Sequence, residues 1–277
     1  MKPVQNQTGQ ADINHARMYY QIAGEGEPFV MIHAGVADSR QWNNEFTYFS
    51  QHYRVLRYDL RGYGKSEPVE GDFTHMGDLV ALLDHLEIHQ PLILMGCSMG
   101  GGLAMDFTLE YPDKVKALIM VDSNPSDWEL EVPTPPKFDE AEKAYEDGDW
   151  DPLAELETQI WFDGVGRTPD QVNPEMRKLL YEMDRLALSH EAKGLGKRLP
   201  DTKIPAAEGL NQLKIPILVI VGDHDIASIL AAADYMVEKI PSARKVTIED
   251  AAHLPNMDHP DKFREILLNF LDNLPKE

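Results

Sequence analysis

The sequence contains a single cysteine, Cys97, among its 277 residues. An intrachain disulfide is therefore excluded, and packing alone must hold the fold together. Long apolar runs are also missing, since no stretch reaches the roughly 20 residues that a membrane-spanning helix needs. The first residues, MKPVQNQTGQADIN, lack the apolar core of a signal peptide. We therefore expect a cytoplasmic protein with no membrane partner.

Positive charge is scarce as well. The chain has 26 Lys and Arg residues against 47 Asp and Glu residues, which gives a formal net charge of −21. Such a surface repels a phosphate backbone, so the sequence argues against nucleic-acid binding. Metal-binding motifs of the H-E-x-x-H or Cys/His-cluster kind are also missing, and the isolated Asp-His-Asp at 223–225 is too little to predict a site. We expect neither a metal nor a cofactor.

What the sequence does contain is a series of short apolar segments typical of strands buried on both faces of a parallel sheet. Helical patterns alternate with these segments, for example where leucines recur between Leu79 and Leu86 and apolar residues recur between Phe263 and Leu271. This alternation predicts an α/β fold with a mostly parallel central sheet flanked by helices. The expected strands are 15–24, 29–33, 53–62, 92–95, 117–121, 217–221 and 243–250.

The alternation stops between about Asn124 and Leu213. Three helix-like stretches, near 137–147, 151–162 and 174–193, follow a Pro-rich connector there, and no convincing strand separates them. We therefore predict a core domain of residues 1–123 and 214–277, with a helical lid of residues 124–213 inserted before the late strands. The first part of this lid is acidic, since residues 126–160 hold twelve Asp and Glu but two Lys.

The segment GCSMG at 96–100 fits the pattern G-x-S-x-G, between a buried-strand pattern and a helical one. That context is typical of a nucleophile elbow, a sharp turn that exposes a serine at the carboxyl end of a strand. Ser98 would stand at the tip, with Gly96 and Gly100 where only a very small residue fits. Gly101 and Gly102 would let the helix lie close to the sheet. Cys97, one place from the tip, is expected to be a packed side chain.

A serine hydroxyl needs a base, and the base needs a carboxylate that orients it. In elbow-type hydrolases the chain order is serine, acid, histidine. His253, in the loop after the last strand, is the predicted base, and Asp225, after the strand at 217–221, is the predicted acid. Asp223 and Asp122 are the alternative acids, because each also follows a buried strand.

The oxyanion formed during such a reaction needs two backbone N–H donors. Met99, the residue after the nucleophile, is expected to supply one. The loop at 31–42 is expected to supply the other from Gly35, with Val36 as the alternative donor. Three tryptophans, Trp42, Trp128 and Trp161, are candidates for the walls of a substrate pocket.

Taken together, these segments resemble the α/β-hydrolase superfamily, in particular its lidded serine hydrolases such as carboxylesterases and enol-lactone hydrolases. The resemblance covers nearly the whole chain and includes IHAG, YDLRGYGKS, GCSMGG, GDHD and AAHLPNMDHP in the family's order. One departure is His33-Ala34, where the family usually has His-Gly; this is why the second oxyanion donor stays open between Gly35 and Val36.

The resemblance implies hydrolysis of a small carboxylic ester or lactone through an acyl-enzyme on Ser98. The acidic lid and the net negative charge should slow the approach of anions, so we expect neutral short- to medium-chain substrates to be preferred. Carbon–carbon bond hydrolases of the meta-cleavage type and perhydrolases share the triad and are alternatives. The carbon–carbon hydrolases usually carry Gly-Pro-Gly in the oxyanion loop and a Trp after the histidine, and neither is present here. A receptor-like relative with little turnover is the alternative from another class. The oligomeric state stays open.

Overall fold

The computed structural model describes residues 6–275 except 129, 131, 133–134 and 203–204. Its centre is an eight-stranded sheet in the order β1-β2-β4-β3-β6-β7-β9-β10, in which β1 and β2 run antiparallel to their neighbours and the other strands are parallel. The strands are β1 (Gln7–Ile13), β2 (Ala16–Ala23), β3 (Pro28–Ile32), β4 (Arg54–Tyr58), β6 (Leu92–Cys97), β7 (Val115–Val121), β9 (Ile217–Gly222) and β10 (Ala243–Ile248). The α/β-hydrolase architecture that the sequence predicts is confirmed. β1 was not among the predicted strands.

The central strands have no exposed face, which explains why their sequences are continuously apolar. Successive residues alternate between two core clusters: Val30 and Ile32 of β3 belong to one, and Phe29 and Met31 to the other. Helices α2 (His75–His85), α3 (Met99–Glu110) and α8 (Ala227–Lys239) pack on the first face, while α1 (Asn43–Phe49) and α10 (Pro260–Asp272) pack on the second. The short helices α7 (Ala206–Gly209) and α9 (Pro255–Asp258) complete the core.

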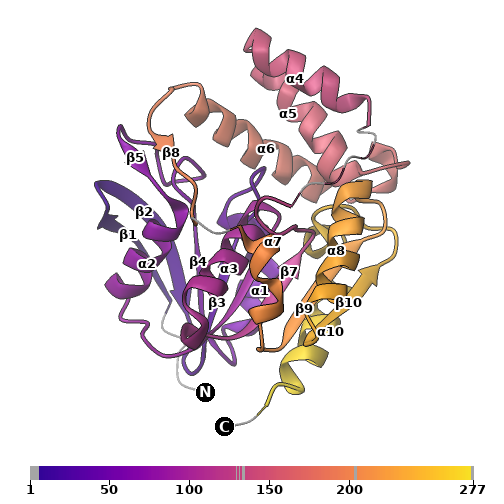
Figure 1. Cartoon of the computed structure of the whole chain (residues 1–277). Helices are drawn as coiled ribbons and strands as arrows, with labels where there is room; N and C mark the ends of the chain where they lie inside the picture. Colours follow the sequence, from indigo (N-terminus) through magenta and orange to yellow (C-terminus); the bar gives the residue numbers. More distant parts are fainter. Residues whose placement is uncertain (1–5, 129, 131, 133–134, 203–204, 276–277) are drawn as a thin grey trace.

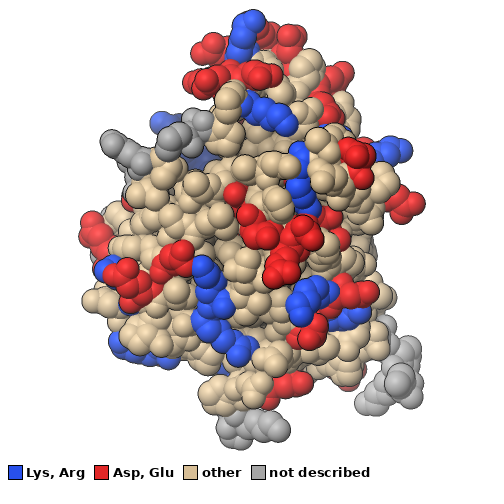
Figure 2. Space-filling model, turned by 90° about the vertical axis from the view of Figure 1, so that its right-hand side faces the viewer, with Lys and Arg blue, Asp and Glu red and all other residues tan. Residues whose placement is uncertain are grey.

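Between β7 and β9 the chain forms a helical insertion, which consists of α4 (Lys137–Asp147), α5 (Trp150–Thr158), a π-helical turn (Gln159–Asp163) and α6 (Pro174–Glu191). These helices lie at the end of the molecule opposite both chain termini (Figure 1). Acidic side chains crowd the outer end of the insertion (Figure 2). A two-stranded sheet of β5 (Asp72–Phe73) and β8 (Lys197–Arg198) connects the end of the insertion to the core.

Local sequence signals explain where the inserted helices begin and end. The side chain of Asn173 accepts hydrogen bonds from the N–H groups of Glu175 and Met176, and Pro174 occupies the first turn of α6. Helix α4 ends at Gly148, which has φ 72°. Among the residues that the structure describes, no helix combines the length and apolarity needed to cross a membrane.

Arg167 connects the insertion to the loop that follows β10. Its guanidinium donates to the carbonyl of Asp163 at 2.7 Å, to the carbonyl of Asp250, and to the carboxylate of Asp258 at 2.7 Å. The side chains of Arg167 and Asp258 are 5% and 7% exposed. Because this ion pair is buried and each partner would be unpaired without the other, it holds the π-helical turn in a fixed position over the loop.

Candidate active site

Ser98 lies at a strained turn between β6 and α3. Its backbone has φ 52° and ψ −120°, a combination that costs a non-glycine residue about 1–3 kcal/mol and persists only where the surrounding structure enforces it. A Cβ on Gly96 would lie 2.1 Å from the carbonyl oxygen of Gly100, and one on Gly100 would lie 2.4 Å from that of His33. The chain therefore reverses in a space that admits no side chain at either position, as the elbow pattern predicts.

Gly101 and Gly102, which follow in α3, differ in the space that is available for a side chain. A Cβ on Gly101 would lie 2.5 Å from Oγ of Ser123, so the close approach of α3 to the sheet depends on this glycine. A Cβ on Gly102 would have its nearest neighbour at 3.6 Å, which is an ordinary contact. The expectation that Gly102 lets α3 lie close to the sheet is therefore wrong, because a side chain would fit at this position without displacing a neighbour.

The strand ends bring His253 and Asp225 together. Nδ1 of His253 lies 2.7 Å from Oδ2 of Asp225, and the N–H of Ile226 donates to Oδ1 of the same carboxylate at 2.7 Å. Asp225 and His253 are 3% and 1% exposed. An ionised carboxylate at this distance holds the imidazole with its proton on Nδ1 and leaves Nε2 free to accept one. Asp223, an alternative acid, is exposed and has no such contact with His253.

Asp122, the other alternative acid, lies beside this pair. Its Oδ1 accepts the N–H of Gly222 at 2.9 Å, while its Oδ2 is buried without a hydrogen bond from another described group. Burial, followed by the charge of Asp225 and a hydrogen bond to it, raises the pKa of Asp122 well above its usual range. The raised pKa favours the protonated form of Asp122, and Asp225 is the carboxyl that contacts His253.

Asp122, Asp225 and His253 are also the one group of described residues whose oxygen and nitrogen atoms lie close enough together to ligate a metal ion, all within 4.8 Å. The hydrogen bond between His253 and Asp225 and the pairing of strands β7 and β9, which Asp122 and Asp225 follow, bring these atoms close together.

The three candidate pocket tryptophans have different positions. The ring of Trp161, on the π-helical turn, lies 4.4 Å from the ring of His253, and the Trp161 carbonyl accepts the His253 N–H at 3.2 Å. Trp42 is completely buried against Phe263 and does not line the cavity described below, which corrects its predicted position. Trp128 packs on Tyr235 of α8 and is also absent from the cavity wall.

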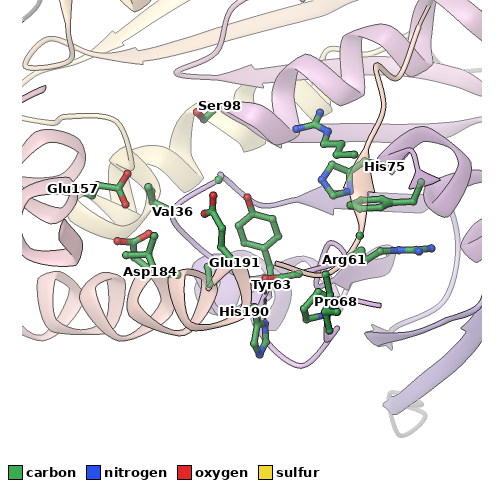
Figure 3. Close-up of a pocket in the computed structure, with 18 of the residues that line it drawn as sticks. Val36, Arg61, Tyr63, Pro68, His75, Ser98, Glu157, Asp184, His190 and Glu191 are labelled. Carbon is green, nitrogen blue, oxygen red and sulfur yellow. Dashed lines mark hydrogen bonds between the residues drawn. The ribbon is translucent and has the colours of Figure 1, made fainter. Parts of the chain in front are cut away.

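A cavity of about 520 Å³ opens between the core and the insertion (Figure 3). Ser98, His253 and Trp161 line it together with Gly35 and Val36, so the predicted nucleophile, the predicted base and both candidate loop donors share one space. A volume of this size accommodates a small organic molecule.

The cavity wall also includes polar residues that the sequence analysis did not assign to the site. They come from the Arg-Gly-Tyr turn, from α2 and from the insertion, and comprise Arg61, Tyr63, His75, Glu157, Asp184, His190, Glu191 and Arg198. One signal was available in the sequence: Asp184 and Glu191 fall at helical spacing on the same face of α6 as Leu180 and Ala187, and so interrupt an otherwise apolar face.

The loop after β3 has one amide that is already engaged. The N–H of Ala34 donates to Oε1 of Gln41 at 2.9 Å, which leaves Gly35 and Val36 as the candidate donors. Gly35 lies against Met99, since a Cβ on Gly35 would be 3.8 Å from that of Met99. The loop and the start of α3 therefore meet beside Ser98, where an oxyanion would form.

Two residues near the site have structural roles. Nε2 of His33 accepts the N–H of Leu60 at 2.9 Å and its Nδ1 donates to the carbonyl of Ala34 at 2.8 Å; burial lowers the pKa of this imidazole, so it stays neutral. Cys97 is buried and burial raises the pKa of its thiol well above the usual range, which rules it out as a thiolate nucleophile at neutral pH.

Comparison with known proteins identifies the family. The family model of the alpha/beta hydrolase fold matches residues 27–260. A pimeloyl-[acyl-carrier protein] methyl ester esterase of Nitrosospira multiformis is 27% identical over 266 residues, covering 91% of this chain and 97% of the relative. A 2-hydroxy-6-oxononadienedioate/2-hydroxy-6-oxononatrienedioate hydrolase of Paraburkholderia phymatum is 27% identical over 268 residues, covering 92% and 91%.

Among solved structures, the enol-lactonase of Burkholderia xenovorans superposes with a TM-score of 0.76 at 25% identity, covering 95% of this chain and 100% of that one. These similarities confirm the predicted fold and the predicted resemblance to hydrolases of ester bonds. The chain belongs to the α/β-hydrolase family.

Proposed function

We propose that this protein is a serine hydrolase that cleaves carboxylic esters or lactones of small molecules through an acyl-enzyme on Ser98. The observation that carries the proposal is the shared cavity: a serine at a strained elbow and a buried imidazole fixed by a carboxylate at 2.7 Å line the same space. The similarity to a methyl ester esterase and to an enol-lactonase supports the same chemistry.

In the first half of the reaction, Oγ of Ser98 attacks the ester carbonyl carbon while Nε2 of His253 takes the hydroxyl proton. The carbonyl oxygen becomes an oxyanion, for which the N–H groups of Met99 and of Gly35 or Val36 are the proposed donors. The C–O bond to the alcohol then breaks, and the imidazolium returns its proton to the leaving oxygen. Asp225 stabilises the imidazolium throughout and stays ionised.

In the second half, a water molecule gives its proton to Nε2 of His253 and attacks the acyl carbon of the Ser98 ester. The second oxyanion collapses, the bond to Oγ breaks, and the proton passes from the imidazolium to Oγ. The acid product and the free enzyme result. A lactone follows the same steps and opens to a hydroxy acid.

We propose residues 124–213 as the lid over this site, because the insertion supplies one wall of the cavity and is tied to the His253 loop by Arg167. The net charge of −21 slows the approach of anions, so neutral short- to medium-chain substrates should be hydrolysed faster than anionic ones. A cytoplasmic location is also part of the proposal.

A carbon–carbon bond hydrolase on the same triad is the second candidate, and the similarity to the 2-hydroxy-6-oxononadienedioate hydrolase is the observation that favours it. Both candidates use Ser98, so the choice between them rests on which substrate is turned over.

The test is steady-state hydrolysis of p-nitrophenyl esters from acetate to decanoate, beside a 2-hydroxy-6-oxodienoate. We expect repeated turnover of the esters and a loss of about 10⁴-fold or more in kcat for Ser98→Ala. Labelling by a p-nitrophenyl phosphonate should add one phosphonyl group to Ser98, as located by peptide mass. A single slow turnover, or faster cleavage of the dienoate, would overturn the proposal in favour of a receptor-like relative or of the second candidate.

A further inference from the structure

Three carboxyl groups of the insertion face the cavity. Glu157 comes from α5, and Asp184 and Glu191 come from α6. Figure 3 shows the carboxyl groups of Glu157 and Asp184 turned toward the same space and that of Glu191 projecting from α6 toward the side where Ser98 lies. The side of the cavity that the insertion forms is thus acidic.

Asp184 is buried in a way that an unpaired aspartate rarely tolerates. It is 2% exposed, and its Oδ2 has no hydrogen bond from another described group. Burial, followed by the charge of Glu157 and a hydrogen bond to it, raises the pKa of Asp184 to about 10, and burial raises the pKa of Glu157 as well. At neutral pH the two carboxyls therefore share one proton and keep one negative charge between them.

The cations that line the same cavity do not neutralise this charge. Arg61 forms a buried ion pair with Asp78 at 2.7 Å, and Arg198 pairs with Asp201 at 2.8 Å. Within the described part of the chain, neither Glu157 nor Asp184 forms an ion pair with Lys, Arg or His.

Glu191 adds a second negative charge. It is exposed and accepts the Tyr145 hydroxyl at 2.7 Å, and no cation of the described residues is paired with it. The inserted side of the cavity therefore has a net negative charge, and one of its acids is held away from water with an unsatisfied oxygen.

We propose that this wall binds a positively charged amine group of the substrate, with Glu157 and Asp184 as the binding carboxyls and Glu191 as a further source of attraction. When an ammonium group enters, the negative charge that Glu157 and Asp184 share gains a counter-charge, and the oxygen of Asp184 that has no partner gains a hydrogen bond. The rings of Tyr63 and Trp161 line the same cavity and can add cation–π attraction. This inference rests on the proposed esterase function and names the substrate class that the same cavity selects.

The first test measures binding and does not depend on turnover. Isothermal calorimetry compares hexylammonium with 1-hexanol on the full chain at low ionic strength, where electrostatic attraction is least screened. We expect hexylammonium to bind about tenfold more tightly than the alcohol, as for a partly desolvated ion pair. Equal or weaker binding of hexylammonium would overturn the inference.

The second test measures kcat/KM for two matched substrate pairs, because the charge can lie on either side of the ester. One pair is p-nitrophenyl 6-aminohexanoate and p-nitrophenyl heptanoate; the other is butyrylcholine and 3,3-dimethylbutyl butyrate. We expect the cationic member to be preferred about tenfold in at least one pair. The preference should fall to about one in the double variant Glu157→Gln, Asp184→Asn, since the amides keep the shape but remove the charge.

The matched control is Glu182→Gln, which removes one charge from an exposed position on α6 outside the cavity wall and should leave the preference unchanged. Partial unfolding of a variant does not affect the ratio of the two kcat/KM values, because both substrates are measured with the same enzyme preparation. A preference that survives the double variant, or its absence from both pairs, would overturn the inference. Failure of all ester turnover with hexylammonium binding intact would instead overturn the proposed function and leave the cation site supported.

Discussion

Two pairs of carboxyl groups lie near the cavity, one buried in the core and one in the insertion, where Asp184 is buried and Glu157 is half-buried; the two pairs have different partners. Asp122 and Asp225 follow the adjacent parallel strands β7 and β9, and His253 lies 2.7 Å from the second of them. Glu157 and Asp184 lie on the packed helices α5 and α6 and have no basic partner among the described residues. In each pair burial raises the pKa of one carboxyl, Asp122 in the core and Asp184 in the insertion, well above its usual range.

Placing two carboxyl groups side by side away from water is energetically unfavourable, and the two pairs serve different functions. In the core, the ionised carboxylate has an imidazole beside it, so the pair is complete and its function is to orient His253. In the insertion, the residual charge is uncompensated within the chain, which is what a binding site for a cation requires. The comparison predicts that a change of Asp225, the core carboxyl beside His253, lowers kcat, whereas changes to the inserted pair alter the preference for cationic substrates and the pH dependence of stability.

The largest effect is expected from Asp225→Asn. An amide at this position donates to Nδ1 instead of accepting from it, so His253 would hold its proton on Nε2 and could not take one from Ser98. We expect kcat for a p-nitrophenyl ester to fall about 10⁴-fold, with little change in thermal stability. Asp223→Asn, two residues away and exposed, is the control and should keep the activity. A loss of less than tenfold would show that another acid orients the base.

An intermediate effect is expected on the stability of Asp184→Asn as a function of pH. A carboxyl whose pKa is raised on folding contributes stability that is present below its unfolded pKa and is lost as pH rises through its folded pKa. For Asp184 this window extends from near 4 to about 10. The asparagine variant has no carboxyl at this position and does not lose this stability. Its melting temperature, relative to that of the wild type, should therefore increase as pH rises.

Melting temperatures of the wild type and of Asp184→Asn at pH 5, 7 and 9 check this prediction. We expect the difference in favour of the variant to widen by at least about 5 °C over that range, because each pH unit inside the window costs the wild type up to about 1.4 kcal/mol and about 1 kcal/mol corresponds to 2–4 °C. Other buried acids, such as Glu45 with a pKa of about 7, affect both proteins equally and cancel in the difference. A constant or narrowing difference would contradict the assigned protonation of the inserted pair.

The sequence was sufficient wherever a local pattern determines the geometry. G-x-S-x-G between an apolar run and a helix predicts the elbow because Gly96 and Gly100 would collide with backbone if they carried a Cβ. The choice of Asp225 follows the chain order of elbow-type hydrolases, and in the structure this carboxylate is the one in contact with His253. The strand ranges could be predicted because strands buried on both faces have few polar residues to obscure them.

The sequence was not sufficient to predict the position of a side chain where packing between elements distant in the chain determines it. Trp42 follows the oxyanion loop, yet its ring turns to the core against Phe263 of α10, more than 200 positions away in the chain. β1 is polar on its outer face because it is the edge strand, so its apolar pattern is weak. The pairing of Glu157 with Asp184 depends on how α5 packs on α6, which neither helix specifies alone.

The smallest effect is expected from Asp122→Asn, which tests whether the two members of the core pair have the assigned roles. The amide oxygen can still accept the N–H of Gly222, and the amide nitrogen can replace the carboxyl proton as the donor to Asp225. We therefore expect kcat/KM for a p-nitrophenyl ester to stay within about threefold of the wild type, since the ionised carboxylate beside His253 is unchanged. Asp122→Leu is the contrasting variant: it removes both interactions and leaves the Gly222 N–H unpaired, which should lower the free energy of unfolding by about 1–3 kcal/mol in urea titrations. If Asp122→Asn abolished turnover while Asp225→Asn did not, the ionised acid of the triad would be Asp122, and the core pair would have the opposite assignment.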